Sequence, residues 1–221
     1  MTRILEVREQ ILKENDRTAR SLRERFDALG LLVIDLVSSP GAGKTELLVS
    51  TISQLSARGI RSGVIVGDLA TDNDAIRLAA TGAPAKQIVT GGVCHLEAAM
   101  IEACLGHFDL ERLDILFIEN VGNLVCPATW DLGEDQRVLL FPVTEGEDKP
   151  LKYPTLINTA DMVLITKTDL SNAVDFDRDA AIGNTRAARH DIAILEVSAK
   201  SGVGLTSWVD WLCDRTQQKA V

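Results

Sequence analysis

The sequence predicts an α/β fold: a mostly parallel sheet of about seven strands flanked by helices, with an N-terminal helical segment. Short apolar runs with the length of buried strands alternate with stretches of helical periodicity, as in a parallel sheet covered on both faces. The first of these runs leads through a glycine-rich turn into a helix. The expected strands are 31–37, 62–66, 86–89, 115–119, 138–143, 162–166 and 192–197, and the expected helices include 44–56, 96–105, 177–189 and 205–216.

Residues 1–30 are expected to form the helical segment, and residues 31–221 a single further domain. Apolar residues recur in the segment at helical spacing, with charged residues between them. They are Ile4, Val7, Ile11, Leu22, Phe26 and Leu29. Asn15 and Asp16 favour a break in this helix, and Gly30 is a typical helix stop. We interpret the segment as a helix that packs on the domain; the alternative is an arm that binds a partner.

The composition excludes several classes of protein. A length of 221 residues suits one domain with a full core. The formal net charge of -9 argues against a nucleic-acid-binding protein that works by neutralising phosphates. No apolar run approaches the ~18 residues that cross a bilayer, and the charged start lacks a signal-peptide core, so we expect a cytoplasmic protein without a membrane partner. The four cysteines are expected to be thiols rather than disulfides.

A phosphate-binding loop is the strongest motif in the chain. Residues 31–48 read LLVIDLVSSPGAGKTELL, a buried strand followed by a turn and a helix. Backbone N–H groups and the positive helix end face an anion in this arrangement. Lys44 is placed to reach the β- and γ-phosphates and Thr45 to bind Mg²⁺, although Ser38 stands where the usual P-loop motif has glycine. The residues expected around the phosphates are Ser39, Pro40, Gly41, Ala42, Gly43, Lys44 and Thr45.

Acidic residues follow two other strands, in the order that a GTPase needs. In GDLATDND, Asp68 is expected to approach Mg²⁺ through water, and Asp72 or Asp74 to orient the attacking water. A helix cap is the alternative for Asp72. In IENVGN, Glu119 is expected to hold Mg²⁺, and Gly122 to let a backbone N–H approach the γ-phosphate. The alternative for Glu119 is a solvent-exposed carboxylate at a strand end.

Two further strand ends favour guanine over adenine. ITKTD keeps the lysine and aspartate of the guanine-selecting Asn-Lys-x-Asp element, with Thr166 at the Asn position. Asp169 is expected to accept two N–H bonds from the base edge, which adenine cannot offer, and Lys167 to lie along the base. SAKSG ends the last strand and is expected to donate a backbone N–H to the guanine oxygen. Its base-binding residues are Ser198, Ala199 and Lys200.

A cysteine, a histidine and a second cysteine form the candidate metal site. GGVCHL carries Cys94 and His95, and NLVCPA carries Cys126, seven residues beyond Glu119. Thiolate and imidazole suit Ni²⁺, Zn²⁺ or Co²⁺. Three ligands leave the coordination incomplete, so a symmetric dimer is the simplest way to complete it. The alternative is that both cysteines are small buried hydrophobic residues and that His95 starts a helix.

Five stretches together resemble one known family. SSPGAGKTELL, GDLATDNDA, TGAPAKQIVTGGVCHLEA, FIENVGNLVCPATWDLGE and VTEGEDKPLKYP are similar to the hydrogenase nickel-incorporation GTPases, and the similarity runs from about Glu6 to Val209. The resemblance implies GTP as the nucleotide and a P-loop GTPase domain that dimerises across its nucleotide faces. It also implies a Ni/Zn site at the dimer interface, formed by the residues matching Cys94, His95 and Cys126.

The resemblance further implies a role and its partners. It implies a GTP-hydrolysing metallochaperone that supports nickel insertion into NiFe-hydrogenase, with nucleotide state coupled to dimerisation and metal release. Its partners are a small nickel/zinc-binding hydrogenase accessory protein and, indirectly, the hydrogenase large subunit. The chain departs from the family at Thr166 and at Glu46 after GKT. It also lacks the N-terminal cysteine motif and the histidine-rich tract that some members carry, which leaves one metal site.

Other functions remain as alternatives at this point. Within GTPases they are the urease accessory protein and the chaperone of cobalamin-dependent mutases, which the GVCHL and NLVCPA pair fits less well. A P-loop kinase or ATP-dependent ligase has no use for Asp169. A passive metal-binding module has no use for an intact Lys44 and Thr45.

Overall fold

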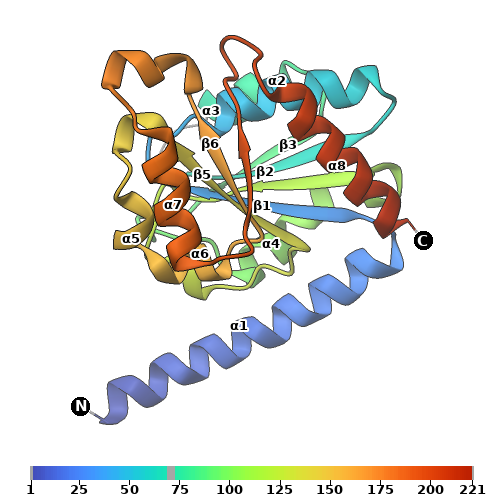
Figure 1. Cartoon of the computed structure of the whole chain (residues 1–221). Coiled ribbons are helices and arrows are strands. Elements are labelled where there is room, and N and C mark those ends of the chain that lie inside the picture. Colours follow the sequence, from blue (N-terminus) through green and yellow to red (C-terminus); the bar gives the residue numbers. More distant parts are fainter. Residues whose placement is uncertain (1, 69–72, 221) are drawn as a thin grey trace.

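The computed structural model describes residues 2–68 and 73–220. Within these ranges, seven strands form one sheet in the order β3-β2-β4-β1-β5-β6-β7, and all neighbouring strands are parallel (Figure 1). The expected fold class is therefore confirmed. The strands are β1 (Leu32–Ser38), β2 (Ser62–Asp68), β3 (Ala85–Val89), β4 (Ile115–Glu119), β5 (Gln136–Pro142), β6 (Met162–Thr166) and β7 (Ala193–Glu196).

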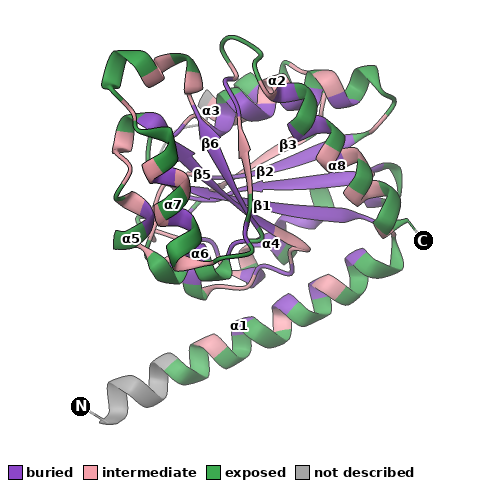
Figure 2. Ribbon diagram, in the orientation of Figure 1, coloured by how far each residue is buried: buried purple, intermediate pink, exposed green. Residues whose placement is uncertain are grey.

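Helices cover both faces of this sheet. They are α1 (Thr2–Ala28), α2 (Lys44–Ala57), α3 (Asn73–Ala79), α4 (Ala98–Cys104), α5 (Lys149–Lys152), α6 (Pro154–Thr159), α7 (Arg178–Ala188) and α8 (Leu205–Lys219). α2 and α8 pack on one face, while α1 and α4, and further along α6 and α7, pack on the other. β1 is buried along its whole length (Figure 2). Its apolar side chains alternate between the core on the side of α2 and α8 and the core on the opposite face. No helix in the described ranges has both the length and the apolar character that crossing a bilayer requires.

The N-terminal helix differs from its expected form. α1 is continuous through Asn15 and Asp16 and lies along the outside of the domain (Figure 1), so the expected break is wrong. The reason is that Asn15 is buried on the same face of the helix as Ala19, Leu22 and Phe26, and its amide finds two hydrogen-bond partners in the domain. A polar residue on the packed face of a helix need not break it when its hydrogen bonds are made.

The segment 144–154, TEGEDKPLKYP, is charged and lies between two strands, yet it is largely helical. It runs through a 3₁₀ turn (Val143–Glu145), α5 and the start of α6. Pro150 and Pro154 lie in the first turns of α5 and α6, where a proline loses no hydrogen bond and its fixed φ angle suits a helix. The two prolines therefore lie at the starts of two short helices.

The expected functional residues collect at one edge of the sheet. β1, β2, β4 and β6 all run in the same direction, so their carboxyl ends meet there. Parallel α/β sheets bind ligands beyond this edge. The phosphate loop follows β1, and Asp68, Glu119 and Thr166 are the last residues of the other three strands.

Candidate nucleotide and metal site

The turn between β1 and α2 has the backbone of a phosphate cradle. Gly41 and Gly43 have φ angles of 73° and 94°, in the left-handed region that glycine adopts without strain. α2 begins directly after Gly43, so the free N–H groups of its first turn border the hollow beside this loop. The Lys44 ammonium donates to Ser38 Oγ at 2.9 Å, so the serine at the usual glycine position holds this lysine. Burial lowers the pKa of Lys44, against the attraction of Glu119.

Glu119 is a buried carboxylate at the end of β4. Its Oε1 accepts a hydrogen bond from Thr45 Oγ1 at 2.9 Å, whereas its Oε2 has no hydrogen-bond partner among the described residues. Burial raises the pKa of Glu119 to about 7, although Lys44 and the Thr45 hydroxyl act in the opposite direction. Asp68 lines the same hollow. An unpaired carboxylate oxygen beside a hydroxyl and a second carboxylate fits a hydrated Mg²⁺ ion.

The hollow also contains charged residues on α3. Asp72 lies outside the described residues. Asp74, in the first turn of α3, lines the hollow, as does Arg77, which forms ion pairs with Asp74 at 3.9 Å and with Glu46. The sequence analysis did not single out Arg77, because an arginine on a helix surface carries no motif.

The loop after β4 packs directly against the phosphate loop. A Cβ at Gly122 would fall 2.8 Å from the Cα of Pro40, so only glycine lets the two backbones approach this closely. Asn123 then shapes the turn toward the second cysteine: its Oδ1 accepts hydrogen bonds from the N–H groups of Val125 at 2.7 Å and Cys126 at 3.3 Å. One short, ordered loop thus joins the nucleotide hollow to Cys126.

A second hollow adjoins the first and contains the expected base-binding residues. Asp169, Ala199 and Lys200 line it. Ser198 does not, but its hydroxyl donates to Asp169 Oδ1 at 2.6 Å and so orients that carboxylate. The two hollows share Ala42, Gly43 and Glu46.

Two more residues of the ITKTD stretch, Thr166 and Lys167, donate hydrogen bonds to the phosphate loop. Thr166 donates its hydroxyl to the carbonyl of Ala42 at 3.0 Å, and the Lys167 ammonium donates to the carbonyl of Gly41 at 2.7 Å. Lys167 has a φ of 59°, uncommon for a residue with a side chain. Both residues therefore stabilise the phosphate loop from the side of the second hollow.

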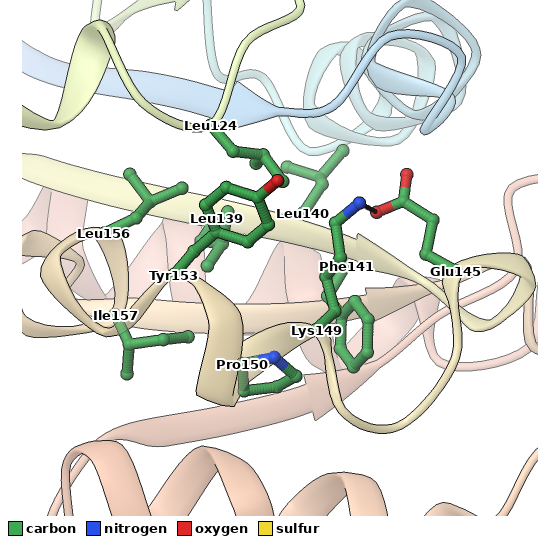
Figure 3. Close-up of a pocket in the computed structure, with 10 residues that line it drawn as sticks. All are labelled: Leu124, Leu139, Leu140, Phe141, Glu145, Lys149, Pro150, Tyr153, Leu156 and Ile157. Atoms are coloured by element: carbon green, nitrogen blue, oxygen red, sulfur yellow. Dashed lines mark ion pairs between the residues drawn. The ribbon is translucent and has the colours of Figure 1, made fainter.

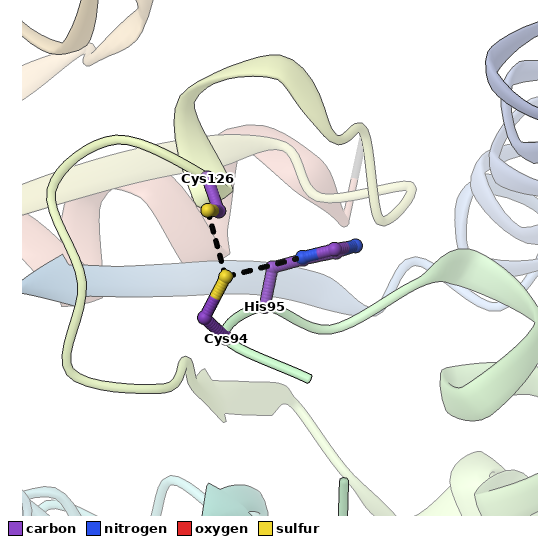
Figure 4. A group of neighbouring side chains, drawn as sticks. All are labelled: Cys94, His95 and Cys126. Atoms are coloured by element: carbon purple, nitrogen blue, oxygen red, sulfur yellow. Dashed lines mark hydrogen bonds between the residues drawn. The ribbon is translucent and has the colours of Figure 1, made fainter. Parts of the chain in front are cut away.

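Cys94, His95 and Cys126 meet in the fold, although 32 residues separate the two cysteines (Figure 4). The Cys94 thiol lies 2.7 Å from the Cys126 sulfur and 3.9 Å from His95 Nδ1, and the three ligand atoms lie within 4.8 Å of one another. None of the four cysteines, all within the described ranges, forms a disulfide. Two sulfurs and an imidazole nitrogen are a donor set for a soft divalent cation such as Ni²⁺ or Zn²⁺.

Two neighbours flank the imidazole of His95. The ring of Trp130 stacks on it, with 4.3 Å between ring centroids and 23° between planes. On the other side, Nε2 lies 3.6 Å from the Glu97 carboxylate. Burial lowers the pKa of His95, partly offset by Glu97, which favours the neutral form that binds metal. A carboxylate behind a ligating histidine is a common orienting partner. The sequence analysis missed both neighbours.

A buried charge network joins β1, β5 and the segment that contains Trp130 and Glu134. Arg137 donates to Asp35 Oδ2 at 3.1 Å, to Glu134 at 2.6 Å and to the carbonyl of Trp130 at 2.6 Å. Asn120, next to Glu119, donates to the other oxygen of Asp35 at 3.1 Å. Burial raises the pKa of Asp35, although Arg137 opposes it. Asp35, which interrupts the apolar run of β1, is therefore the partner of an arginine on the neighbouring strand.

A small apolar hollow lies under the loop that carries Cys126 (Figure 3). Leu124 covers it, and β5, α5 and α6 supply most of the remaining lining. At its rim, Glu145 accepts a hydrogen bond from the Ser39 hydroxyl and forms an ion pair with Lys149 at 3.1 Å. Ser39 thus ties the phosphate loop to the 3₁₀ turn after β5 and does not line the nucleotide hollow.

Comparison with known proteins places this site in a family. Residues 32–196 match the family described as CobW/HypB/UreG, nucleotide-binding domain. The hydrogenase maturation factor HypB of Azotobacter vinelandii is 51% identical over 211 residues, which span 96% of this chain and 69% of that protein. The chain belongs to the HypB family of hydrogenase maturation factors.

Solved structures of HypB agree with this family. The crystal structure of HypB from Helicobacter pylori in complex with nickel has a TM-score of 0.88 and 37% identity, and the match covers 94% of this chain and 97% of that one. HypB from Archaeoglobus fulgidus has a TM-score of 0.86 and 35% identity, with 92% and 99% coverage. The chain therefore shares the nucleotide-binding domain and the fold of HypB.

Proposed function

We propose that the chain is a GTP-hydrolysing metallochaperone that supports nickel insertion into NiFe-hydrogenase. Membership of the HypB family and the closeness of a phosphate cradle to a thiolate–imidazole cluster support this function. Nickel is the cargo and Zn²⁺ an alternative occupant; the nickel complex of the Helicobacter pylori relative supports the former. The protein works in the cytoplasm with a small nickel/zinc-binding accessory protein, and through it with the hydrogenase large subunit.

The residues of the hollow divide the work of hydrolysis among them. The phosphate loop and Lys44 bind the phosphates, and Asp169 accepts the N–H groups of guanine. Mg²⁺, when bound, neutralises phosphate charge, and Thr45, Asp68 and Glu119 are the residues that would hold it. Asp72 is our candidate for the residue that orients the attacking water. Water then displaces GDP from the γ-phosphate.

The observation that carries the proposal is the loop from Glu119 to Cys126. Its Gly122 packs on Pro40 of the phosphate loop, and four residues later Cys126 faces Cys94. Loss of the γ-phosphate releases the contact near Gly122, and the loop then moves the Cys126 sulfur relative to the other two ligands. Metal affinity therefore follows the state of the nucleotide.

A homodimer completes the metal site in this proposal. Three ligands from one chain leave at least one position of a tetrahedral ion open. A second copy related by two-fold symmetry brings the same residues to the same place. Nucleotide and metal binding thus both favour the dimer.

Two variants with separate defects test the proposal. Lys44→Ala is expected to abolish GTP hydrolysis and retain Ni²⁺ binding. Cys126→Ser is expected to lose Ni²⁺ binding and retain GTP hydrolysis. Neither should restore hydrogenase activity at low nickel in a bacterium that lacks its own maturation factor of this family, while wild type and the exposed control Lys13→Ala should. Full restoration by Cys126→Ser would contradict a metal-carrying role, and full restoration by Lys44→Ala would contradict a role for hydrolysis.

A further inference from the structure

One side chain of the N-terminal helix bridges the two segments that carry the metal ligands. Asn15 is 7% exposed. Its Nδ2 donates to the carbonyl of Asp131 at 2.8 Å, and its Oδ1 accepts from the backbone N–H of Ala98 at 2.8 Å. Ala98 lies three residues after His95 and Asp131 five residues after Cys126. We infer that Asn15 is a positioning residue that sets the relative placement of these segments and thereby the metal affinity.

The bridge satisfies groups that otherwise lack partners inside the fold. Ala98 is the first residue of α4, and the first N–H groups of a helix have no partner within it. No side chain caps α4 at its own Glu97, so the Asn15 amide from α1 supplies an acceptor. One amide thus makes a hydrogen bond with each ligand segment. A shift in the position of one segment therefore acts on the position of the other through Asn15.

The segment at Asp131 is also the one that orients the imidazole. Trp130, whose ring stacks on His95, directly precedes Asp131. The Asp131 carboxylate is held by Arg23 of α1 at 2.6 Å and by the N–H of Gly133 at 2.9 Å. Asn15 therefore fixes the backbone that presents the Trp130 ring to the imidazole.

The turn beyond Trp130 packs closely on the helix. A Cβ at Gly133 would fall 2.9 Å from the carbonyl oxygen of Ala19, so the turn and α1 have no room to slide past each other. Ala19 and Leu22 form the apolar surface under this turn and are almost wholly buried. Among the described side chains of this face of α1, Asn15 is the buried polar one, and both of its hydrogen bonds go to the two ligand segments.

The inference rests on the proposed metal function, and the experiment separates the two. Asn15→Leu keeps a similar volume and removes both hydrogen bonds; Asn15→Asp keeps the acceptor for Ala98 and removes the donor to Asp131. Phe26→Leu, eleven residues further along the same face of α1 and without a hydrogen bond from its side chain to either ligand segment, is the control for a general loss of stability. Ni²⁺ and Zn²⁺ affinities are measured by competition with a chromophoric chelator, together with the thiolate-to-nickel absorption band, Trp fluorescence and GDP affinity.

The positioning role predicts a selective loss. Groups that hydrogen-bond a ligating side chain typically contribute 10–100-fold to metal affinity. Asn15 acts one step further out, on the backbone of the ligand segments, so Asn15→Leu should weaken Ni²⁺ binding by about 10-fold, the lower end of that range, and alter the absorption band. Asn15→Asp should fall between it and wild type, and it alone tests the inference if Asn15→Leu does not fold. GDP affinity should stay within twofold for both, and Phe26→Leu should bind Ni²⁺ as wild type does.

Several results would overturn the inference. An unchanged Ni²⁺ affinity in the folded Asn15 variants would overturn it and leave the metal function intact, provided that Cys126→Ser loses binding. An equal loss in Phe26→Leu would reduce Asn15 to a stability role. Wild-type binding that does not depend on Cys126 would overturn both the inference and the proposed metal function.

Discussion

Replacing Glu119 with glutamine should stabilise the nucleotide-free protein while it impairs the nucleotide site. Glutamine keeps an oxygen that can accept the Thr45 hydroxyl and removes the charge. Burial raises the pKa of Glu119 from an ordinary 4.5 to about 7. A shift of this size corresponds to roughly 3 kcal/mol of unfavourable ionisation in the folded state.

The pH dependence of this effect has a definite sign. Below about pH 4.5 the carboxyl is protonated in both the folded and the unfolded chain, so it costs nothing. Between pH 4.5 and 7 the unfolded chain releases the proton and the folded chain keeps it, so stability falls as pH rises. Above pH 7 the full penalty is present. Glu119→Gln should therefore match wild type near pH 4.5 and exceed it by roughly 3 kcal/mol at pH 8.

Urea unfolding from pH 4.5 to 8.5, without nucleotide and with chelator present, measures this difference. Glu111→Gln, at an exposed position, is the matched control and should show no such change. In GTP hydrolysis with Mg²⁺, wild type should be the better of the two proteins, because glutamine is a poor ligand for Mg²⁺. The activity of Glu119→Gln should be about 100-fold or more below that of wild type. A Glu119→Gln variant that is less stable than wild type at pH 8 would refute the reasoning, since it would mean that Lys44 more than offsets the burial of the charge.

Three further predictions concern the base, the buried charges and the metal. Asp169→Asn should lower GTP affinity by about 100-fold or more and improve XTP binding, because the amide donates where guanine needs an acceptor; competition binding of the two nucleotides measures it. Arg137→Met should cost about 3–5 kcal/mol in urea unfolding, because it strands the fully buried Asp35, and adding Asp35→Asn should recover part of that loss. Equal stability of the single and double variants would contradict the pairing. Cys126→Ser should lose most Ni²⁺ affinity by chelator competition while GDP affinity stays within twofold; an unchanged Ni²⁺ affinity would remove Cys126 from the site.

Features with local signals were predictable from the sequence. A strand, a glycine turn and a helix are complete within residues 31–56, so the phosphate loop and the place of Lys44 and Thr45 followed from one stretch. The positions of Asp68 and Glu119, which end β2 and β4, and of Asp169, three residues after β6, followed because parallel strands bring their carboxyl ends to one edge. The adjacency of Cys94 and His95 indicated two of the three candidate metal ligands, and NLVCPA suggested Cys126 as the third; the approach of its sulfur to that of Cys94 depends on the fold.

Features that depend on distant partners were not predictable. Asn15 bonds residues 83 and 116 positions away, and Arg137 meets Asp35 across 102 positions. No spacing in a sequence indicates which residues pair over such distances. Asn15 therefore suggested only a helix break, and Asp35 only a polar residue within an apolar strand. Trp130 likewise gave no signal as the partner of His95, because aromatic residues in turns usually serve packing alone.

The most direct test of the coupling between the two sites is Ni²⁺ affinity in two nucleotide states. The wild-type protein is titrated with Ni²⁺ against a competing chelator, once with saturating GDP and once with a non-hydrolysable GTP analogue, both with Mg²⁺. A loop that reaches from Glu119 to Cys126 predicts that the two affinities differ by about fivefold or more. Equal affinities would show that the state of the nucleotide does not reach the metal ligands, and would contradict the account.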